Sequence, residues 1–156
     1  MYTFRVLIVD DEVDFLETIV NRLQKRKVEA TGVLSGEAAI ELMDEKLFDV
    51  VLLDIKMPGG MDGIEVLREI KKMHPLTEVI LLTGHASVEM SIEGLKLGAF
   101  DYLIKPVKFN ELLDKLGAAF QKKNAQEQRI RGAKIQELIH FPGHMFDPKE
   151  AEKEKN

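Results

Sequence analysis

Acidic residues directly follow two short apolar segments of the chain, and a lysine follows a third. In chain order these residues are Asp10, Asp11, Asp54 and Lys105. Because ligands of an open parallel sheet bind at the carboxyl ends of its strands, these side chains are expected to share one crevice. Clustered carboxylates repel one another unless a cation joins them. The pattern therefore predicts a site for a divalent metal ion and a phosphate group.

The apolar segments that position these residues have the length and composition of strands. Strands are predicted at 4–9, 28–33, 49–53, 78–82 and 100–104. Four of them are runs of Val, Ile, Leu or Phe, as expected for strands buried on both faces. The second alternates more strongly in polarity and is predicted to lie at an edge of the sheet.

Helical patterns separate the predicted strands. Apolar residues recur there at spacings of three and four, for example at Phe15, Ile19 and Leu23. Ser35 and Asn110 are the expected N-cap residues of the second and fifth helices. Alternating strands and helices of this length predict an α/β fold, with a doubly wound parallel sheet of five strands.

Composition and charge exclude several classes of protein. The chain has 156 residues, which indicates one domain with an additional tail, and 45% of them are hydrophobic, enough for a core. It contains no cysteine, so disulfides and thiolate zinc sites are excluded. The net charge of −5 argues against a dominant role in binding nucleic acid but allows a local basic patch.

The sequence also lacks targeting signals for a membrane. No apolar run approaches the roughly 20 residues that span a bilayer. The N-terminus enters a predicted strand directly and lacks the layout of a signal peptide. We therefore expect a cytoplasmic location.

Asp54 has the chemistry of a phosphate acceptor. A carboxylate can attack a phosphoryl group to form an aspartyl phosphate. Mg²⁺ prefers oxygen ligands in octahedral geometry and would reduce the repulsion between the two anions. Asp11 and Asp54 are expected to supply carboxylate ligands, Asp10 a further or water-mediated contact, and Lys56 its backbone carbonyl.

Two further residues are suited to bind phosphoryl oxygens. Lys105 supplies a compact positive charge, and Thr83, at the end of the fourth predicted strand, supplies a hydroxyl. Simpler interpretations exist for single residues. Capping of the first helix could be the whole role of Asp10 and Asp11, and Asp54 could be an ordinary loop acid. Neither interpretation explains why all these positions follow strands of the same sheet.

The chain resembles the receiver domains of two-component response regulators over roughly residues 3 to 121. The motifs that carry this resemblance are Asp10-Asp11-Glu12, Asp54, Met57-Pro58, Asp62-Gly63, Thr83-Gly84 and Asp101-Tyr102-Leu103-Ile104-Lys105-Pro106. The resemblance implies a flavodoxin-like strand order, 2-1-3-4-5, which would bring the first and third strands together.

The same resemblance implies a function. Asp54 would accept a phosphoryl group from the phosphohistidine of a sensor histidine kinase or a phosphotransfer protein, with Mg²⁺ or Mn²⁺ bound. Thr83 would then move toward the phosphate and Tyr102 would swing inward, changing the surface of the fourth helix, fifth strand and fifth helix. Such a protein catalyses only its own phosphorylation and dephosphorylation. Lys56 and His85 would tune the phosphate lifetime, or would simply face solvent.

One loop departs from the family pattern. Between Pro58 and the Asp62-Gly63 pair the chain has one residue more than is usual. The pair Gly59-Gly60 can absorb an insertion, because glycine tolerates unusual backbone dihedrals. Asp54 is not expected to move, whereas the loop geometry and kinase docking there could change.

Other functions are compatible with parts of the pattern. An aspartate-nucleophile phosphohydrolase would carry an Asp-x-Asp motif after the first strand, and Asp10 does not begin one. A flavin-binding module would need a phosphate loop at a place where three consecutive acids, 10–12, would repel phosphate. An unphosphorylated, receiver-like binding module is the remaining alternative.

The C-terminal part is predicted to extend the fifth helix. Residues 122–141 form a helical extension, with Gly132 as a weak point, and Pro142-Gly143 should end it. Residues 142–156 are mostly charged and are expected to be disordered. The segment 121–134 is basic and is interpreted as a solvated helix face.

The apolar residues of this extension suggest a contact surface. They are Ile130, Ile135, Leu138 and Ile139. They could pack back on the domain, form a homodimer or bind a partner, and a dimer or partner contact is slightly favoured. The region after residue 121 is too short for a helix-turn-helix output domain, so direct DNA binding is not expected. The segment 83–102 is similar to receivers attached to ATPase-type transcription activators, which indicates ancestry rather than present output.

Overall fold

Strands and helices alternate along the part of the chain that is described by a computed structural model, residues 4–84 and 87–140. In chain order the elements are β1 (Arg5–Val9), α1 (Val13–Lys25), β2 (Glu29–Val33), α2 (Gly36–Glu45), β3 (Val50–Asp54), α3 (Gly63–Met73), β4 (Glu78–Thr83), α4 (Val88–Lys96), β5 (Asp101–Ile104) and α5 (Phe109–His140). Each predicted strand agrees with the observed one to within one residue at either end.

The five strands form one parallel sheet in the order β2-β1-β3-β4-β5. The predicted flavodoxin-like order is therefore confirmed. β2 lies at one edge, as its alternating sequence predicted, and four of its five residues are not fully buried. β1 and β3 are adjacent, with Val9 opposite Leu53, so the residues that follow these two strands emerge side by side.

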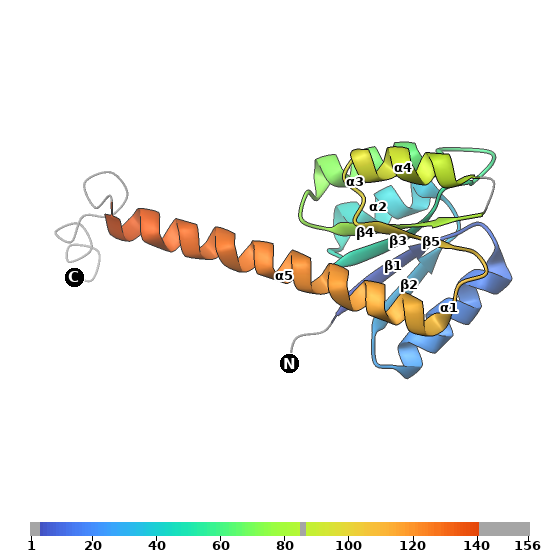
Figure 1. Cartoon of the computed structure of the whole chain (residues 1–156), viewed down its shortest axis with the longest axis horizontal. Coiled ribbons are helices and arrows are strands. Elements are labelled where there is room, and N and C mark those ends of the chain that lie inside the picture. Colours follow the sequence, from blue (N-terminus) through green and yellow to red (C-terminus); the bar gives the residue numbers. More distant parts are fainter. Residues whose placement is uncertain (1–3, 85–86, 141–156) are drawn as a thin grey trace. The chain divides into compact units, whose positions relative to one another are not determined.

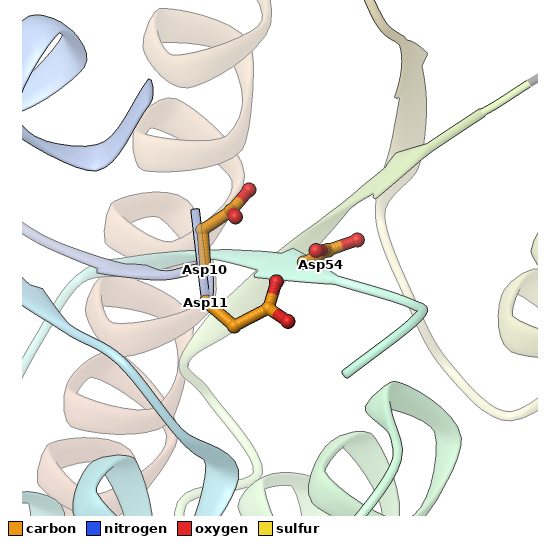
Figure 2. A group of neighbouring side chains, drawn as sticks. All are labelled: Asp10, Asp11 and Asp54. Carbon is orange, nitrogen blue, oxygen red and sulfur yellow. The ribbon is translucent and has the colours of Figure 1, made fainter. Parts of the chain in front are cut away.

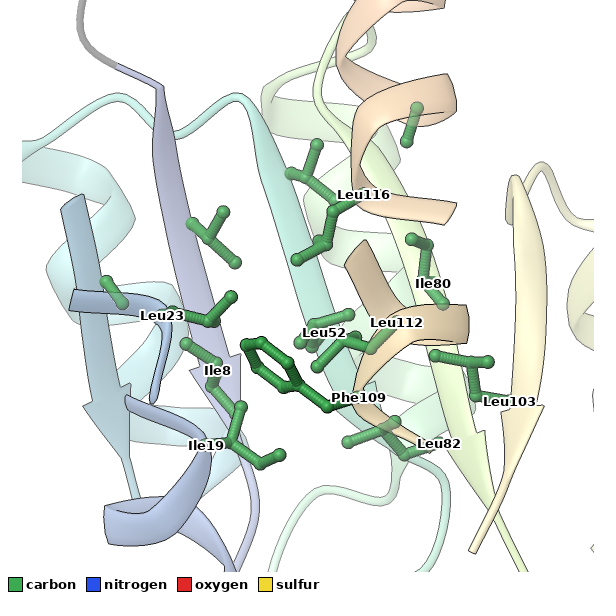
Figure 3. Packing of buried hydrophobic residues seen from close by; sticks show 14 of the residues in the cluster. Ile8, Ile19, Leu23, Leu52, Ile80, Leu82, Leu103, Phe109, Leu112 and Leu116 are labelled. Atoms are coloured by element: carbon green, nitrogen blue, oxygen red, sulfur yellow. The ribbon is translucent and has the colours of Figure 1, made fainter. Parts of the chain in front are cut away.

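Helices cover both faces of the sheet (Figure 1). α1 and the first part of α5 pack on one face, and α2, α3 and α4 lie on the other. Successive strand residues alternate between the two cores: Ile8 and Leu52 face α1 and α5, whereas Leu7 and Leu53 face α2 and α3. Figure 3 shows the first core, where Phe109 inserts between side chains of the sheet and of α1. This packing fixes the strand ends that carry the acidic residues.

The helix starts agree with the sequence prediction in one case and differ in another. Ser35 caps α2 through a hydrogen bond, 3.1 Å long, that its hydroxyl accepts from a backbone N–H of the first turn. The prediction of Asn110 as the N-cap of α5 was wrong. α5 begins at Phe109, and the N–H of Leu112 donates to the carbonyl of Lys108 at 3.0 Å. The Phe109 ring is buried in the core, and the helix begins two residues earlier than an N-cap at Asn110 would place it.

Two buried acids at the amino edge of the sheet contact α5. Asp49 precedes β3 and pairs with Lys123 at 2.7 Å, and Glu78 begins β4 and lies 3.6 Å from the Lys122 ammonium. Both carboxylates are almost completely buried. Basic residues 122 and 123, which the sequence analysis assigned to a solvated face, therefore pair with the base of the sheet.

α5 continues without interruption through Gly132 to His140, as the predicted extension requires. The chain divides into two compact units, residues 1–123 and 124–156. The four apolar residues of the extension are exposed, between 42% and 63% of their surface. The predicted disorder of residues 142–156 concerns a segment outside the described residues. Among the described helices, none is both long and apolar enough to cross a bilayer.

Candidate functional site: an acidic cluster at the carboxyl edge of the sheet

Residues from four strand ends meet at the carboxyl edge of the sheet. Asp54 is the last residue of β3 and Thr83 the last of β4, whereas Asp10 directly follows β1 and Lys105 directly follows β5. All strands run parallel, so these ends lie at the same edge. In this fold the crevice outside that edge is the usual place for a ligand.

Three carboxylates gather in this crevice. One oxygen each of Asp10, Asp11 and Asp54 lies within 4.8 Å of the other two. Figure 2 shows the two consecutive aspartates after β1 beside the aspartate that ends β3. Asp10 and Asp54 are buried, whereas Asp11 is exposed to solvent. The cluster is therefore open on the side of Asp11.

Lys105 supplies the positive charge in this cluster. Its ammonium lies 2.6 Å from Asp10 Oδ2, 3.3 Å from Glu12 Oε1 and 3.6 Å from Asp54 Oδ2. The same ammonium lies 4.5 Å from the centre of the Phe15 ring, within the range of a cation–π contact. Lys105 is thus held between three acids and one aromatic face.

The electrostatic balance of the cluster leaves it short of positive charge. Burial and the nearby charge of Asp10 together raise the pKa of Asp54 to about 6, against the opposing effect of Lys105. Burial also raises the pKa of Asp10, although its hydrogen bond with Lys105 acts in the opposite direction. Burial alone would lower the pKa of Lys105, but the hydrogen bond with Asp10 and the charge of Asp54 raise it overall.

The donor set is compatible with a hard divalent cation. Three carboxylates offer the oxygen ligands that Mg²⁺ prefers, and one lysine leaves part of their negative charge uncompensated. Asp10 does not cap α1: its Oδ1 accepts the Glu12 N–H at 2.8 Å, and Glu12 occupies the N-cap position without a side-chain capping bond. The helix-capping interpretation of Asp10 is therefore wrong.

The β3–α3 loop is fixed at both of its ends. Asp54 Oδ1 accepts the Lys56 N–H at 3.2 Å, and Asp62 caps α3 by accepting the Glu65 N–H at 2.9 Å. Gly63 packs against the backbone of β3, because a Cβ atom there would lie 2.5 Å from the Asp54 carbonyl oxygen. The Lys56 side chain is exposed. Its carbonyl as a metal ligand stays a prediction.

The two residues predicted to switch lie on neighbouring strands, Thr83 at the end of β4 and Tyr102 within β5. Thr83 is buried, and its hydroxyl donates to the Gly84 carbonyl at 3.0 Å. Tyr102 is half-buried against the core on the face of the sheet that α2, α3 and α4 cover, and its carbonyl accepts a hydrogen bond of 2.7 Å from Lys115. Their movement on phosphorylation stays a prediction. His85 lies outside the described residues.

Sequence analysis did not anticipate two contacts of Lys105. Glu12 was named only as part of the Asp10-Asp11-Glu12 motif, yet its carboxylate joins the cluster, 3.3 Å from the Lys105 ammonium. Phe15 was identified only as an apolar residue of the first helix, yet its ring faces the ammonium. Glu12 directly follows the two aspartates, and this adjacency was the available signal. The sequence contains no comparable signal for Phe15.

A known family matches most of the chain. The model of the response regulator receiver domain matches residues 6–117. The chain belongs to the response regulator receiver family. It is 40% identical over 107 residues to the transcriptional regulatory protein ZraR of Escherichia coli. The matched region covers 69% of this chain and 24% of ZraR. It is 33% identical over 124 residues to the response regulator protein PilR of Pseudomonas aeruginosa, which covers 80% of this chain and 28% of that protein.

Solved receiver structures share the fold. The receiver domain of NtrX from Brucella abortus has a TM-score of 0.72 and 31% identity, over 74% of this chain and 98% of that one. A CheY-like receiver domain protein from Methanospirillum hungatei has a TM-score of 0.76 and 30% identity, over 80% of this chain and 99% of that one. The family favours neither the phosphohydrolase nor the flavin alternative. The receiver spans about a quarter of the length of the curated relatives it matches.

Proposed function

We propose that this receiver is phosphorylated on Asp54 by a sensor histidine kinase or a phosphotransfer protein. The position of the Asp54 carboxylate carries the proposal. It is only 6% exposed, belongs to the acidic cluster, and lies 3.6 Å from the Lys105 ammonium. A nucleophile in this place has a cation on one side and further oxygen ligands on the other.

In the proposed reaction an oxygen of Asp54 attacks the phosphorus of a phosphohistidine. A P–O bond forms while the P–N bond breaks, and the imidazole nitrogen keeps the bonding electron pair. With a pKa of about 6, Asp54 is mostly ionised and nucleophilic at neutral pH. Lys105 attracts a phosphoryl oxygen as a point charge, and the Thr83 hydroxyl donates to another.

Mg²⁺, or Mn²⁺ in its place, completes the proposed site. Asp10, Asp11, Asp54 and the Lys56 carbonyl would hold the ion. When bound, it would neutralise oxygens of both the acceptor and the transferred group. The proposal places a second cation beside carboxylates that Lys105 neutralises only in part.

The proposed output is a changed protein-binding surface on α4, β5 and α5. Thr83 and Tyr102 lie on neighbouring strands, with Leu81 paired to Tyr102 and Thr83 paired to Ile104. A shift of the Thr83 hydroxyl toward the phosphate would therefore change contacts with the neighbouring strand β5. The receiver would act on no external substrate, and Lys56 and His85 would tune how long the phosphate lasts.

The proposal extends to the partners of this receiver. The relatives are transcriptional regulators of which this chain matches about a quarter. We infer a protein contact instead of direct DNA binding, because the net charge of the whole chain is −5. A cytoplasmic location, where sensor kinases present their phosphohistidine, is part of the same proposal. The exposed apolar residues of the α5 extension would form a homodimer or a partner contact.

Intact mass after incubation with acetyl phosphate and Mg²⁺ tests the proposal. Wild type should gain one phosphoryl group, and the gain should require the metal and disappear in Asp54→Asn. A label that persists in Asp54→Asn would overturn the assignment of the acceptor. A wild type that stays unlabelled with both acetyl phosphate and a kinase donor would favour an unphosphorylated binding module. Release of phosphate from small phosphate esters would favour the phosphohydrolase alternative.

A further inference from the structure

The extended β3–α3 loop donates a hydrogen bond to a neighbouring helix. Glu37, in the first turn of α2, accepts the backbone N–H of Met61 through Oε1 at 2.6 Å. This bond joins residues that are 24 positions apart. Its presence lowers the pKa of Glu37, so the carboxylate is charged at neutral pH. A charged acceptor makes a stronger bond to a backbone N–H than a neutral one does.

The fold holds Glu37 in place for this contact. The start of α2 packs closely on α3, because a Cβ atom at Gly36 would lie 2.3 Å from Val66 Cγ2 and 3.4 Å from Met61 Cβ. Ser35 caps the same turn. The carboxylate rests against the loop itself, since a Cβ atom at Gly60 would lie 2.7 Å from Glu37 Oε1.

The middle of this loop otherwise has little to hold it. Met57 is buried and Met61 is half-buried against the core, but the three residues between them are exposed. Gly59 has a φ of +90°, and a side chain added there would meet nothing within 4 Å. Two consecutive glycines lose more conformational entropy on ordering than other residues do. The bond to Glu37 restrains the loop just after the extra residue.

The restrained loop borders the acidic cluster. A cavity of about 50 Å³ is lined by Asp11 on one side and by Glu37, Met57 and Met61 on others. Lys56, whose carbonyl is a predicted metal ligand, belongs to the same loop and follows Asp54 by two residues. Only a few residues separate Met61 from the cation site, so greater backbone mobility at Met61 would affect that site.

We propose that Glu37 is a positioning residue for the cation site: it restrains the extended loop at Met61, so that the backbone of Lys56 keeps its place beside Asp54. This inference rests on the proposed function. It also explains how the chain accommodates one additional loop residue without displacing its acceptor. The restraint is needed because the loop is long, and a shorter loop would not need it.

Five variants separate positioning from charge. Glu37→Ala removes the acceptor and the charge, whereas Glu37→Gln removes the charge but keeps an oxygen that can accept. Glu41→Ala removes an exposed acid from the same helix and serves as the control. Deletion of Gly60 shortens the loop, and the same deletion combined with Glu37→Ala completes a double-mutant cycle.

Mn²⁺ binding, measured by electron paramagnetic resonance without any phosphodonor, is the first readout. Glu37→Ala should weaken binding by about 3- to 10-fold, the effect of one lost hydrogen bond. Glu37→Gln, whose neutral oxygen accepts a weaker bond, should fall between Glu37→Ala and wild type, and Glu41→Ala should remain near wild type. In the shortened loop, Glu37→Ala should have no effect. Equal weakening in Glu37→Ala and Glu37→Gln would overturn the positioning role, as would equal effects in the long and short loops.

Amide hydrogen exchange and labelling complete the test. The Met61 amide should exchange faster in Glu37→Ala than in Glu41→Ala. With acetyl phosphate, Glu37→Ala should need more Mg²⁺ for half-maximal labelling while reaching the wild-type rate at saturation. If wild type is labelled on Asp54 but Glu37→Ala behaves identically in all three measurements, the inference fails and the proposed function stands. If wild type neither binds Mn²⁺ nor accepts phosphate, the proposed function itself fails.

Discussion

The ammonium of Lys105 lies 2.6 Å from Asp10 Oδ2, although 95 residues separate the two in the chain. Asp10 is completely buried and Lys105 is only 18% exposed, so water screens this pair weakly. The same ammonium lies 3.6 Å from Asp54 Oδ2. One lysine therefore compensates two buried acids, and its loss would leave both without a cation.

Lys105→Met should destabilise the metal-free protein by about 3 kcal/mol, because breaking a buried pair leaves an uncompensated charge. Mg²⁺ should restore more stability to the variant than it adds to wild type, since the ion replaces the missing cation. Urea unfolding followed by circular dichroism, with EDTA and with Mg²⁺, measures both effects. Lys115→Met is the matched control, because it removes a lysine paired with Asp101 away from the cluster. A Mg²⁺ effect equal in all three proteins would contradict the prediction.

The raised pKa of Asp54 predicts how stability depends on pH. A carboxyl group whose pKa rises from 3.8 in the unfolded chain to about 6 in the fold binds its proton more tightly when folded. The protonated Asp54 therefore stabilises the fold fully below pH 3.8, and this stabilisation is lost as the pH rises through 6. Asp54→Asn carries no such charge. In EDTA the variant should become more stable than wild type across this interval, by about 3 kcal/mol above pH 6.

Unfolding free energies of both proteins between pH 4 and pH 8 test this dependence. The difference in unfolding free energy between Asp54→Asn and wild type should be close to zero near pH 4 and should reach its plateau above pH 6. Mg²⁺ should reduce this free-energy difference at neutral pH, because the ion binds the ionised Asp54 and therefore stabilises wild type but not Asp54→Asn. A constant difference at every pH would show that the substitution acts through packing and not through charge.

Much of the site followed from sequence because strand ends are easily located. Runs such as Val50–Leu53 define a buried strand, and a parallel sheet then brings Asp54 to the same edge as Asp10. Strand order came from the family resemblance. Periodicity alone would not have distinguished this order from other doubly wound arrangements, because it does not specify which strands are neighbours.

Side-chain contacts between distant segments were beyond the reach of the sequence. The bond from Met61 to Glu37 depends on how α2 packs against α3, and local patterns do not encode that packing. The start of α5 was wrong by two residues because burial of Phe109 outweighed the local preference of Asn110 for an N-cap position. Tertiary packing decided both.

Gly63 is predicted to be essential to the geometry of the acceptor. A Cβ atom there would lie 2.5 Å from both the Asp54 carbonyl oxygen and Ile55 Cα, and these backbone atoms cannot rotate away. Gly63→Ala should lower the unfolding free energy by about 3 kcal/mol through overpacking and should slow labelling of Asp54. Gly117→Ala is the control, since a Cβ atom there meets nothing within 4 Å, and it should raise stability by up to about 1 kcal/mol. Wild-type stability and labelling in Gly63→Ala would refute the prediction.

The exposed residues of the α5 extension provide the last prediction. Ile135, Leu138 and Ile139 recur at spacings of three and four and form one stripe, and each is at least 42% exposed. Three large apolar side chains on one helical stripe favour association, because burying them removes apolar surface from water. If two copies associate through this stripe, Ile135→Lys combined with Leu138→Lys should convert a dimer to a monomer in sedimentation equilibrium. Gln136→Lys, on the same helix but off the stripe, should remain dimeric. A wild type that is monomeric at every concentration would exclude the homodimer, and the stripe would then be tested for a heterologous partner.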